Sequence, residues 1–112
     1  MSEPISVAKV GDIAEDEAIV VPKERLGTIE DVAVFFSGGA YSALDDTCTH
    51  ERTSLATGWI EDGVVECPLH AARFCLRDGK VLSLPATRDV ATHEVVVDGD
   101  DVRVVPNPDR LA

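Results

Sequence analysis

Short runs rich in valine and isoleucine recur along this chain at intervals of roughly ten residues, with Gly, Asp and Pro between them. This spacing is typical of an antiparallel β-sandwich or barrel and leaves little room for helices. The first strands are predicted near residues 5–10, 18–21, 32–36 and 40–44. Ser37-Gly38-Gly39 is expected to turn the chain between the last two, because glycine accepts positive φ at low cost.

Three Asp-Gly pairs in the second half of the chain predict three more hairpins. They are Asp62-Gly63 between strands 59–60 and 64–65, Asp78-Gly79 between 74–76 and 81–84, and Asp98-Gly99 between 94–97 and 102–105. Residues 12–17 and 22–27 are interpreted as polar connections and residues 106–112 as a frayed tail. Because no linker interrupts the pattern, residues 1–112 are predicted to form a single all-β domain.

The charge balance restricts the partners of this protein. The 21 Asp and Glu residues against 10 Lys and Arg give a formal net charge of -11, which repels phosphate backbones and anionic lipids. We therefore expect no nucleic-acid and no membrane partner. A basic protein partner fits the charge, and so does a surface that only keeps the protein in solution. The N-terminus has no cationic and apolar signal pattern, so a cytoplasmic protein is expected.

Three cysteines are an odd number, and two of them stand close to histidines, which favours metal ligation over disulfides. The two segments are Cys48-Thr49-His50 and Cys67-Pro68-Leu69-His70, separated by residues 51–66. Each segment follows a predicted strand, so one end of a sheet could present both.

Zinc and iron compete for such a ligand set. Structural zinc sites usually pair like ligands on one loop, which the mixed pairs here do not do. In a Rieske 2Fe-2S centre both cysteines bind one iron and both histidines bind the other, which explains the order of the ligands. The sequence therefore predicts one 2Fe-2S cluster held by Cys48, His50, Cys67 and His70. A zinc-stabilised interaction module without a redox role remains an alternative.

Beyond these ligands the chain resembles Rieske-type ferredoxins, in particular the ferredoxin components of bacterial aromatic-ring dioxygenase systems. The similar stretches are residues 46–50, 66–70, 73–74 and 84–87, within a resemblance that extends from residue 5 to residue 105. The resemblance implies the Rieske fold, a three-sheet antiparallel β structure. In it, a cluster-binding subdomain, here near residues 45–75, is inserted in a base domain. It also places Pro85 on a third loop that covers the cluster.

The resemblance further implies a function. In that family a flavin-containing NAD(P)H reductase supplies an electron, and a terminal Rieske oxygenase with a mononuclear iron receives it. The chain is thus expected to be a one-electron carrier with transient partners in aromatic compound degradation, and not an enzyme. The alternative within the family is the small Rieske-like subunit of assimilatory nitrite reductase.

Four positions separate this chain from the high-potential Rieske proteins. Thr53 and Leu69 stand where those proteins have disulfide-forming cysteines, and Ala72 and Phe74 stand where they have hydroxyl donors to the cluster. Missing donors leave negative charge on a cluster less stabilised. The reduction potential is therefore expected toward the low end of the Rieske range, about −150 mV.

Several other side chains receive simpler interpretations. Cys75 is expected to be a small buried hydrophobe and His93 an exposed strand residue. Trp59 could pack against the cluster subdomain or mediate docking, and packing is the preferred interpretation. Asp45 and Asp46 are expected near the cluster tip, where they would steer a basic partner.

Overall fold

The computed structural model describes residues 3–49, 53–68, 72–83 and 88–112. Their elements follow in the order β1 Ile5–Lys9, β2 Glu17–Val21, α1 Lys23–Leu26, β3 Val32–Ser37, β4 Ala40–Asp45, η1 Leu55–Thr57, β5 Trp59–Glu61, β6 Val64–Glu66, β7 Arg73–Cys75, β8 Thr92–Asp98, β9 Asp101–Val105 and η2 Pro108–Arg110. All strand pairs are antiparallel, as the hydrophobic pattern predicts. Within the described residues, no helix has both the length and the apolar character needed to cross a membrane.

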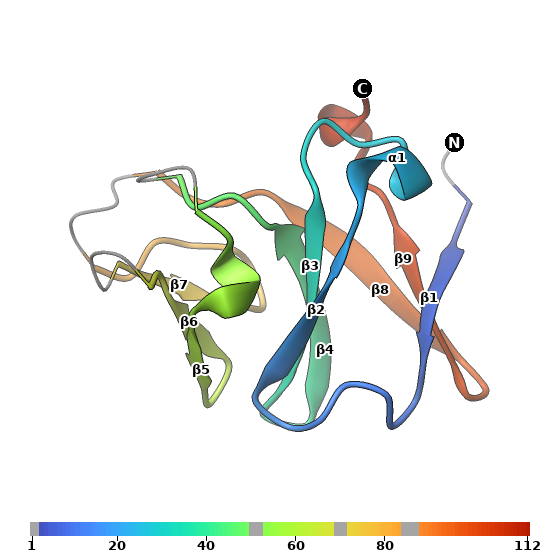
Figure 1. Ribbon diagram of the computed structural model, residues 1–112, viewed down its shortest axis with the longest axis horizontal. Coiled ribbons are helices and arrows are strands. Elements are labelled where there is room, and N and C mark those ends of the chain that lie inside the picture. The colour runs from blue at the N-terminus through green and yellow to red at the C-terminus, as the bar shows by residue number, and fades with distance from the viewer. Residues whose placement is uncertain (1–2, 50–52, 69–71, 84–87) are drawn as a thin grey trace.

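The larger sheet has the strand order β1-β9-β8-β4-β3-β2. Its two halves are joined by a short ladder in which Ala43 and Leu44 of β4 pair with His93 and Thr92 of β8. This narrow join lets the halves splay into two layers (Figure 1), with an apolar core between them. The buried members of that core are Ile13, Val21, Leu26, Val32, Val34, Ala43 and Val104.

The smaller sheet, β5-β6-β7, lies to one side of the larger one (Figure 1). Side chains alternate across a strand, so Ile60, Val65 and Phe74 share one face of this sheet. That face packs on Phe35 and Leu44 of the larger sheet. A second core therefore joins the two sheets.

Most of the predicted turns are confirmed. Gly38 and Gly39 both have positive φ, as do Asp62 and Gly63, which is what a two-residue hairpin turn between twisted strands requires. The hairpin at 98–99 joins β8 to β9 as expected. After residues 78–79, the described part of the predicted strand 81–84 is not a regular strand: Val81 forms an isolated bridge with Phe74, and the Leu82 amide donates to the Arg73 carbonyl.

Two segments are more ordered than the sequence predicted. Residues 22–27 contain a single helical turn, α1, whose Leu26 is buried in the core, so this segment is not a purely polar connection. Residues 106–112 do not fray: they form η2, and Leu111 makes a bridge with Thr28. The Ala112 amide also donates to the Gly27 carbonyl at 2.9 Å. The prediction of a frayed tail was wrong because its partners lie far away in the sequence.

Candidate metal centre

Two loops of the same construction carry the predicted cysteine ligands. In the first, the Cys48 amide donates to the Thr53 carbonyl at 3.0 Å, just inside a bridge between residues 47 and 54. In the second, the Cys67 amide donates to the Ala72 carbonyl at 2.7 Å, just inside the paired residues 66 and 73. Each cysteine thus opens a loop that a backbone hydrogen bond closes with the same spacing.

Both cysteines lie inside the protein. Cys48 is 3% exposed and Cys67 is 1% exposed, and both belong to the core that joins the two sheets. The neighbouring buried members of that core include Leu55, Val65 and Phe74. None of the chain's three cysteines forms a disulfide. Two thiols in one apolar core, on loops of matched construction, form a donor pair that suits an iron-sulfur group or zinc.

His50 and His70, the other two predicted ligands, lie outside the described residues, as does Pro85. Among the residues that are described, no three His, Cys, Asp or Glu side chains gather as a metal site. Of the four predicted ligands, the structure therefore describes the two cysteines.

Hydrogen bonds from Asp46 connect the two chain segments that flank the first loop. Its backbone amide donates to the Asp31 carbonyl at 2.8 Å, and its own carbonyl accepts from the Leu55 amide at 2.6 Å. Its carboxylate Oδ1 accepts from the Ala56 amide at 2.9 Å, which caps η1. Asp46 is only 7% exposed, so the expectation of an exposed steering charge was wrong.

Asp45 is also buried, at 4% exposed, and joins the cysteine loop to the end of the chain. Its Oδ2 accepts from Arg110 Nη2 at 2.7 Å and from Arg110 Nε at 2.8 Å. Its Oδ1 lies 2.8 Å from His93 Nε2. Because a buried carboxylate costs free energy unless it is paired, these contacts explain why an acid can occupy this place. The expectation that Asp45 steers a partner was therefore wrong as well.

The hydrogen bonds of His93 determine its tautomer. The Asn107 amide donates to His93 Nδ1 at 2.9 Å, so Nδ1 carries no proton. The ring hydrogen is then on Nε2 and is donated to Asp45. His93 is 7% exposed, not an exposed strand residue as predicted. Its partner Asn107 comes from the tail, which local sequence could not reveal.

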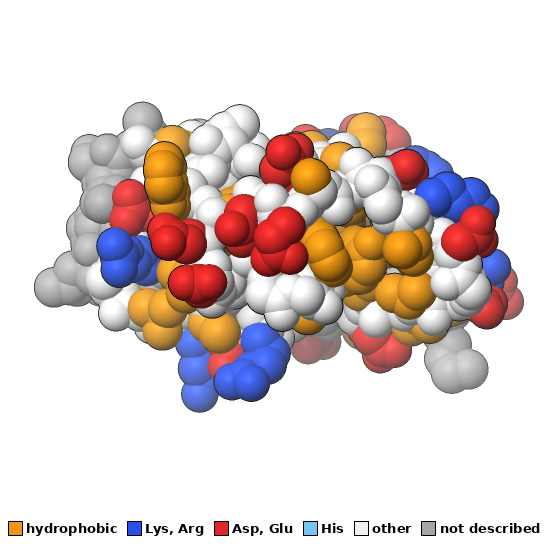
Figure 2. All heavy atoms as spheres, turned by 90° about the horizontal axis from the view of Figure 1, so that it is seen from below, with side chains coloured by type: hydrophobic (Ala, Val, Ile, Leu, Met, Phe, Trp, Pro, Cys, Tyr) orange, Lys and Arg blue, Asp and Glu red, His pale blue; other side chains and the backbone are white. Residues whose placement is uncertain are grey.

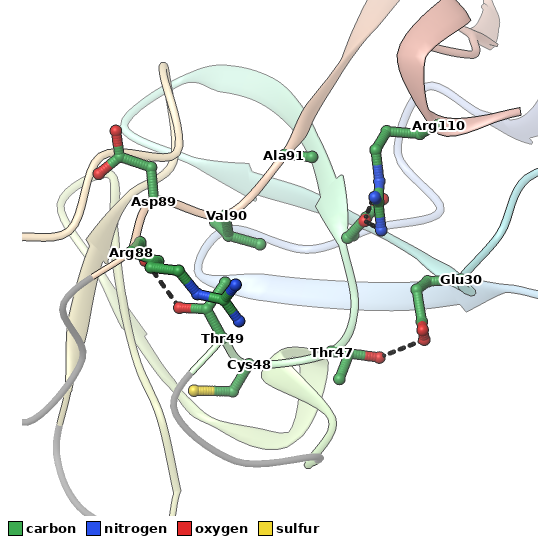
Figure 3. Close-up of a pocket in the computed structure, with 10 residues that line it drawn as sticks. Glu30, Thr47, Cys48, Thr49, Arg88, Asp89, Val90, Ala91 and Arg110 are labelled. Atoms are coloured by element: carbon green, nitrogen blue, oxygen red, sulfur yellow. Dashed lines mark hydrogen bonds and ion pairs between the residues drawn. The ribbon is translucent and has the colours of Figure 1, made fainter.

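A cavity of about 350 Å³ borders the first loop (Figure 3). Its lining residues are Glu30, Asp45, Thr47, Cys48, Thr49, Arg88, Asp89, Val90, Ala91 and Arg110. The threonines on either side of Cys48 are both fixed: Thr47 Oγ1 donates to Glu30 at 2.7 Å, and Thr49 Oγ1 donates to the Arg88 carbonyl at 2.7 Å. The Thr-Cys-Thr sequence could have indicated that hydroxyl groups on both sides of Cys48 hold this loop in place, but the sequence analysis did not predict it.

Two side chains near the second loop also differ from expectation. Trp59 is 70% exposed, so it does not pack against the subdomain as predicted. The reason is strand alternation, which points its neighbour Ile60 inward and Trp59 outward. Cys75 is only partly buried, because it lies on the same outward face.

Comparison with known proteins places these features in context. A family model described as the Rieske [2Fe-2S] domain matches residues 3–94. The chain is 43% identical over 99 residues to the 3-phenylpropionate/cinnamic acid dioxygenase ferredoxin subunit of Escherichia coli (strain K12), covering 88% of this chain and 89% of that one.

Solved structures agree with this match. The ferredoxin of carbazole 1,9a-dioxygenase from Nocardioides aromaticivorans IC177 is 30% identical, with a TM-score of 0.85 over 95% of this chain and 100% of that one. A ferredoxin chain in a complex of reduced oxygenase and oxidized ferredoxin of carbazole 1,9a-dioxygenase is 31% identical, with a TM-score of 0.83 over 91% of this chain and 92% of that one.

Proposed function

This chain belongs to the Rieske [2Fe-2S] domain family, and we propose that it carries single electrons from a flavoprotein reductase to a terminal oxygenase that attacks an aromatic compound. The predictions of the Rieske fold and of one 2Fe-2S cluster are confirmed by the family match and the similar structures. The prediction of an electron-transfer component, not a catalytic subunit, is confirmed by relatives named as ferredoxin subunits. An oxygenase partner agrees with the relative that was solved in complex with one.

Cys48 and Cys67 are proposed to bind one iron of the cluster, and His50 and His70 the other. The observation that carries the proposal is the pair of matched loops, which bring two buried thiols into one core. When bound, the cluster supplies the capacity to accept and release one electron. The chain's own task is to hold the thiols in place and keep water from them. The two loop-closing hydrogen bonds and the apolar core around Val65 and Phe74 serve that task.

We also propose the division into a base domain and a cluster-binding subdomain near residues 45–75. The small sheet β5-β6-β7 and both cysteine loops fall within these limits. The larger sheet lies outside them, apart from the last residue of β4. Residues 1–112 are then one domain built from two parts.

We further propose that the electron donor is a flavin-containing NAD(P)H reductase and that the exchange takes place in the cytoplasm. A net charge of -11 suits transient encounters with basic partner surfaces. The identity of 43% to a dioxygenase ferredoxin favours this assignment over a nitrite reductase subunit. A zinc module is disfavoured because the family's group is a 2Fe-2S cluster.

Metal and sulfide analysis tests the ligand assignment. We expect about two iron and two sulfide per chain and a red-brown visible spectrum. Cys67→Ala and His50→Ala should abolish both. Cys75→Ser is the matched control, because Cys75 lies outside the two loops and should not affect the cluster.

Stoichiometric zinc without sulfide, in protein made with ample iron, would contradict the assignment. The carrier role is tested separately by stopped-flow mixing of the reduced protein with its oxygenase. We expect the cluster to be reoxidised by the oxygenase within the turnover time. A reduced protein that the oxygenase cannot reoxidise would refute the carrier role while leaving the ligand assignment intact.

A further inference from the structure

The outward face of the small sheet carries an ordered row of side chains. Trp59 of β5 pairs with Glu66 of β6, and Glu66 pairs with Arg73 of β7, so the three lie side by side across the sheet. The opposite face of the same strands is buried in the core, which leaves this face to solvent.

Leu82 extends the row by one position. Its amide donates to the Arg73 carbonyl at 2.7 Å, and its neighbour Val81 forms a bridge with Phe74 and packs against the core. Leu82 therefore faces outward and is 53% exposed. We call the four residues Trp59, Glu66, Arg73 and Leu82 the outer band.

The outer band places a large apolar side chain at each end of an ion pair. Arg73 Nε lies 3.1 Å from Glu66 Oε1, with both side chains partly open to solvent. Isolated exposed hydrophobic residues are ordinary on protein surfaces. Here, however, the two most exposed large hydrophobic side chains among the described residues stand in one row. That arrangement indicates an interaction surface for another macromolecule.

Trp59 is held in place and surrounded by negative charge. Its indole Nε1–H donates to Glu61 Oε2 at 3.1 Å, which fixes the ring while its faces stay open. Glu61, Asp62 and Glu66 line the hollow of about 410 Å³ beside it, against a single cation, Arg73. Figure 2 shows acidic side chains around exposed hydrophobic surface on the half of the molecule that carries the small sheet. A partner that fits must combine an apolar recess with a border of Lys or Arg.

The outer band also lies at the base of the second cysteine loop. Glu66 immediately precedes Cys67, and Arg73 immediately follows Ala72, so the band crosses the two strand ends from which the loop emerges. A protein that approaches this loop to receive an electron meets the band at the same time.

We propose that the outer band is a docking surface for the terminal oxygenase, with Trp59 as its anchor. This proposal rests on the proposed electron-carrier function. Transient redox complexes bury little surface, so one or two anchors carry much of their affinity. Tryptophan is the residue most often found in that role, because it buries a large rigid area. The oxygenase contributes the recess for the indole and the basic residues that face Glu61 and Asp62.

Binding and electron transfer to the oxygenase are measured with Trp59→Ala and Leu82→Ala. We expect Trp59→Ala to raise the oxygenase concentration at half-saturation by roughly tenfold or more, and Leu82→Ala by less. Trp59→Phe should recover part of the affinity. Val97→Ala is the matched control, because Val97 is 48% exposed on β8, in the other sheet, and should change nothing. The visible spectrum and reduction potential of all variants should match those of the unmodified protein.

A second readout does not depend on electron transfer. Trp59 is the only tryptophan of the chain, so incorporation of 5-fluorotryptophan gives a single ¹⁹F resonance. Addition of oxidised oxygenase should shift or broaden this resonance, and excess salt should reverse the change.

Unchanged half-saturation for Trp59→Ala, or a ¹⁹F resonance that ignores the oxygenase, would overturn the docking proposal. A loss of affinity for the reductase alone would overturn it as well, since the band would then serve the other partner. Failure of the unmodified protein to reduce any oxygenase would instead refute the carrier function.

Discussion

Replacement of Asp45 by alanine should destabilise the protein far more than removal of an exposed acid. The carboxylate is buried, and it receives three charged or ring hydrogen bonds, two from Arg110 and one from His93. Truncating one partner of a buried ion pair costs about 3–5 kcal/mol, because the other charge stays behind without compensation. The Arg110 side chain is 31% exposed and regains some hydration, so we expect the lower end, about 3 kcal/mol. At about 4 °C per kcal/mol for a domain of this size, the melting temperature should fall by about 12 °C.

The assay is thermal and chemical unfolding of the oxidised holoprotein, followed by circular dichroism and by the visible absorption of the cluster. Asp98→Ala is the control, because Asp98 pairs with Arg103 at 3.5 Å and is 67% exposed. Exposed pairs of this kind contribute less than about 1 kcal/mol. Arg110→Ala, alone and combined with Asp45→Ala, completes a double-mutant cycle.

An Asp45→Ala protein as stable as the Asp98→Ala control would refute this reasoning. So would additive effects of the Asp45 and Arg110 substitutions, because a shared ion pair requires the second loss to be smaller than the first. Either result would mean that the Asp45–Arg110 ion pair does not tie the tail to the first cysteine loop.

Three further outcomes are expected. Ala72→Ser and Phe74→Tyr together should raise the reduction potential by about 85 mV in protein-film voltammetry, because each hydroxyl donor is worth about 1 kcal/mol to the reduced state of a one-electron centre. No shift in a variant with an intact spectrum would show that the two hydroxyls do not reach the cluster. Gly58→Ala should lower stability and iron content, since its Cβ would lie 2.1 Å from a backbone carbonyl of β6 just before the second cysteine loop; normal iron content would contradict this. The Ser6 hydroxyl, followed by a nearby arginine and lysine, lowers the pKa of Asp101 to about 2, so this carboxylate adds stability above its ordinary pKa of 3.8 that is lost as the pH falls toward 2. In NMR titration Ser6→Ala should raise the pKa of Asp101, and an unchanged value would rule out the hydroxyl as its main cause.

Local features of the fold could be predicted from the sequence. The hairpins at Gly38-Gly39 and Asp62-Gly63 depend on two adjacent residues with positive φ, and Gly and Asp are residue types that predict this conformation. The strand positions follow from alternation of apolar and polar residues. The cluster was predicted from two short motifs, because each motif holds its ligand types within a few residues. The Rieske fold was predicted from the resemblance to a family, which extends well beyond those motifs.

Features that depend on distant partners could not be predicted. Asp45 and Arg110 are 65 positions apart, and nothing near either residue indicates the other. His93 resembles a surface strand residue until Asn107 is folded onto it. Trp59 is a different case, because the alternation of residues along β5 and β6 already indicates that its side chain points outward. A stricter use of the period of two would have predicted it.

The core that joins the two sheets has a consequence for protein engineering. Ala33, Phe35 and Leu44 from the larger sheet pack in the same cluster of side chains as Val65 and Phe74 from the small one. A graft of residues 45–75 onto another scaffold would leave the first three behind and expose the inner face of the small sheet. A transplanted redox module should therefore include β3 and β4, or a host surface with two large apolar side chains at the positions of Phe35 and Leu44. Without such a surface, we expect the graft to aggregate before it can take up iron.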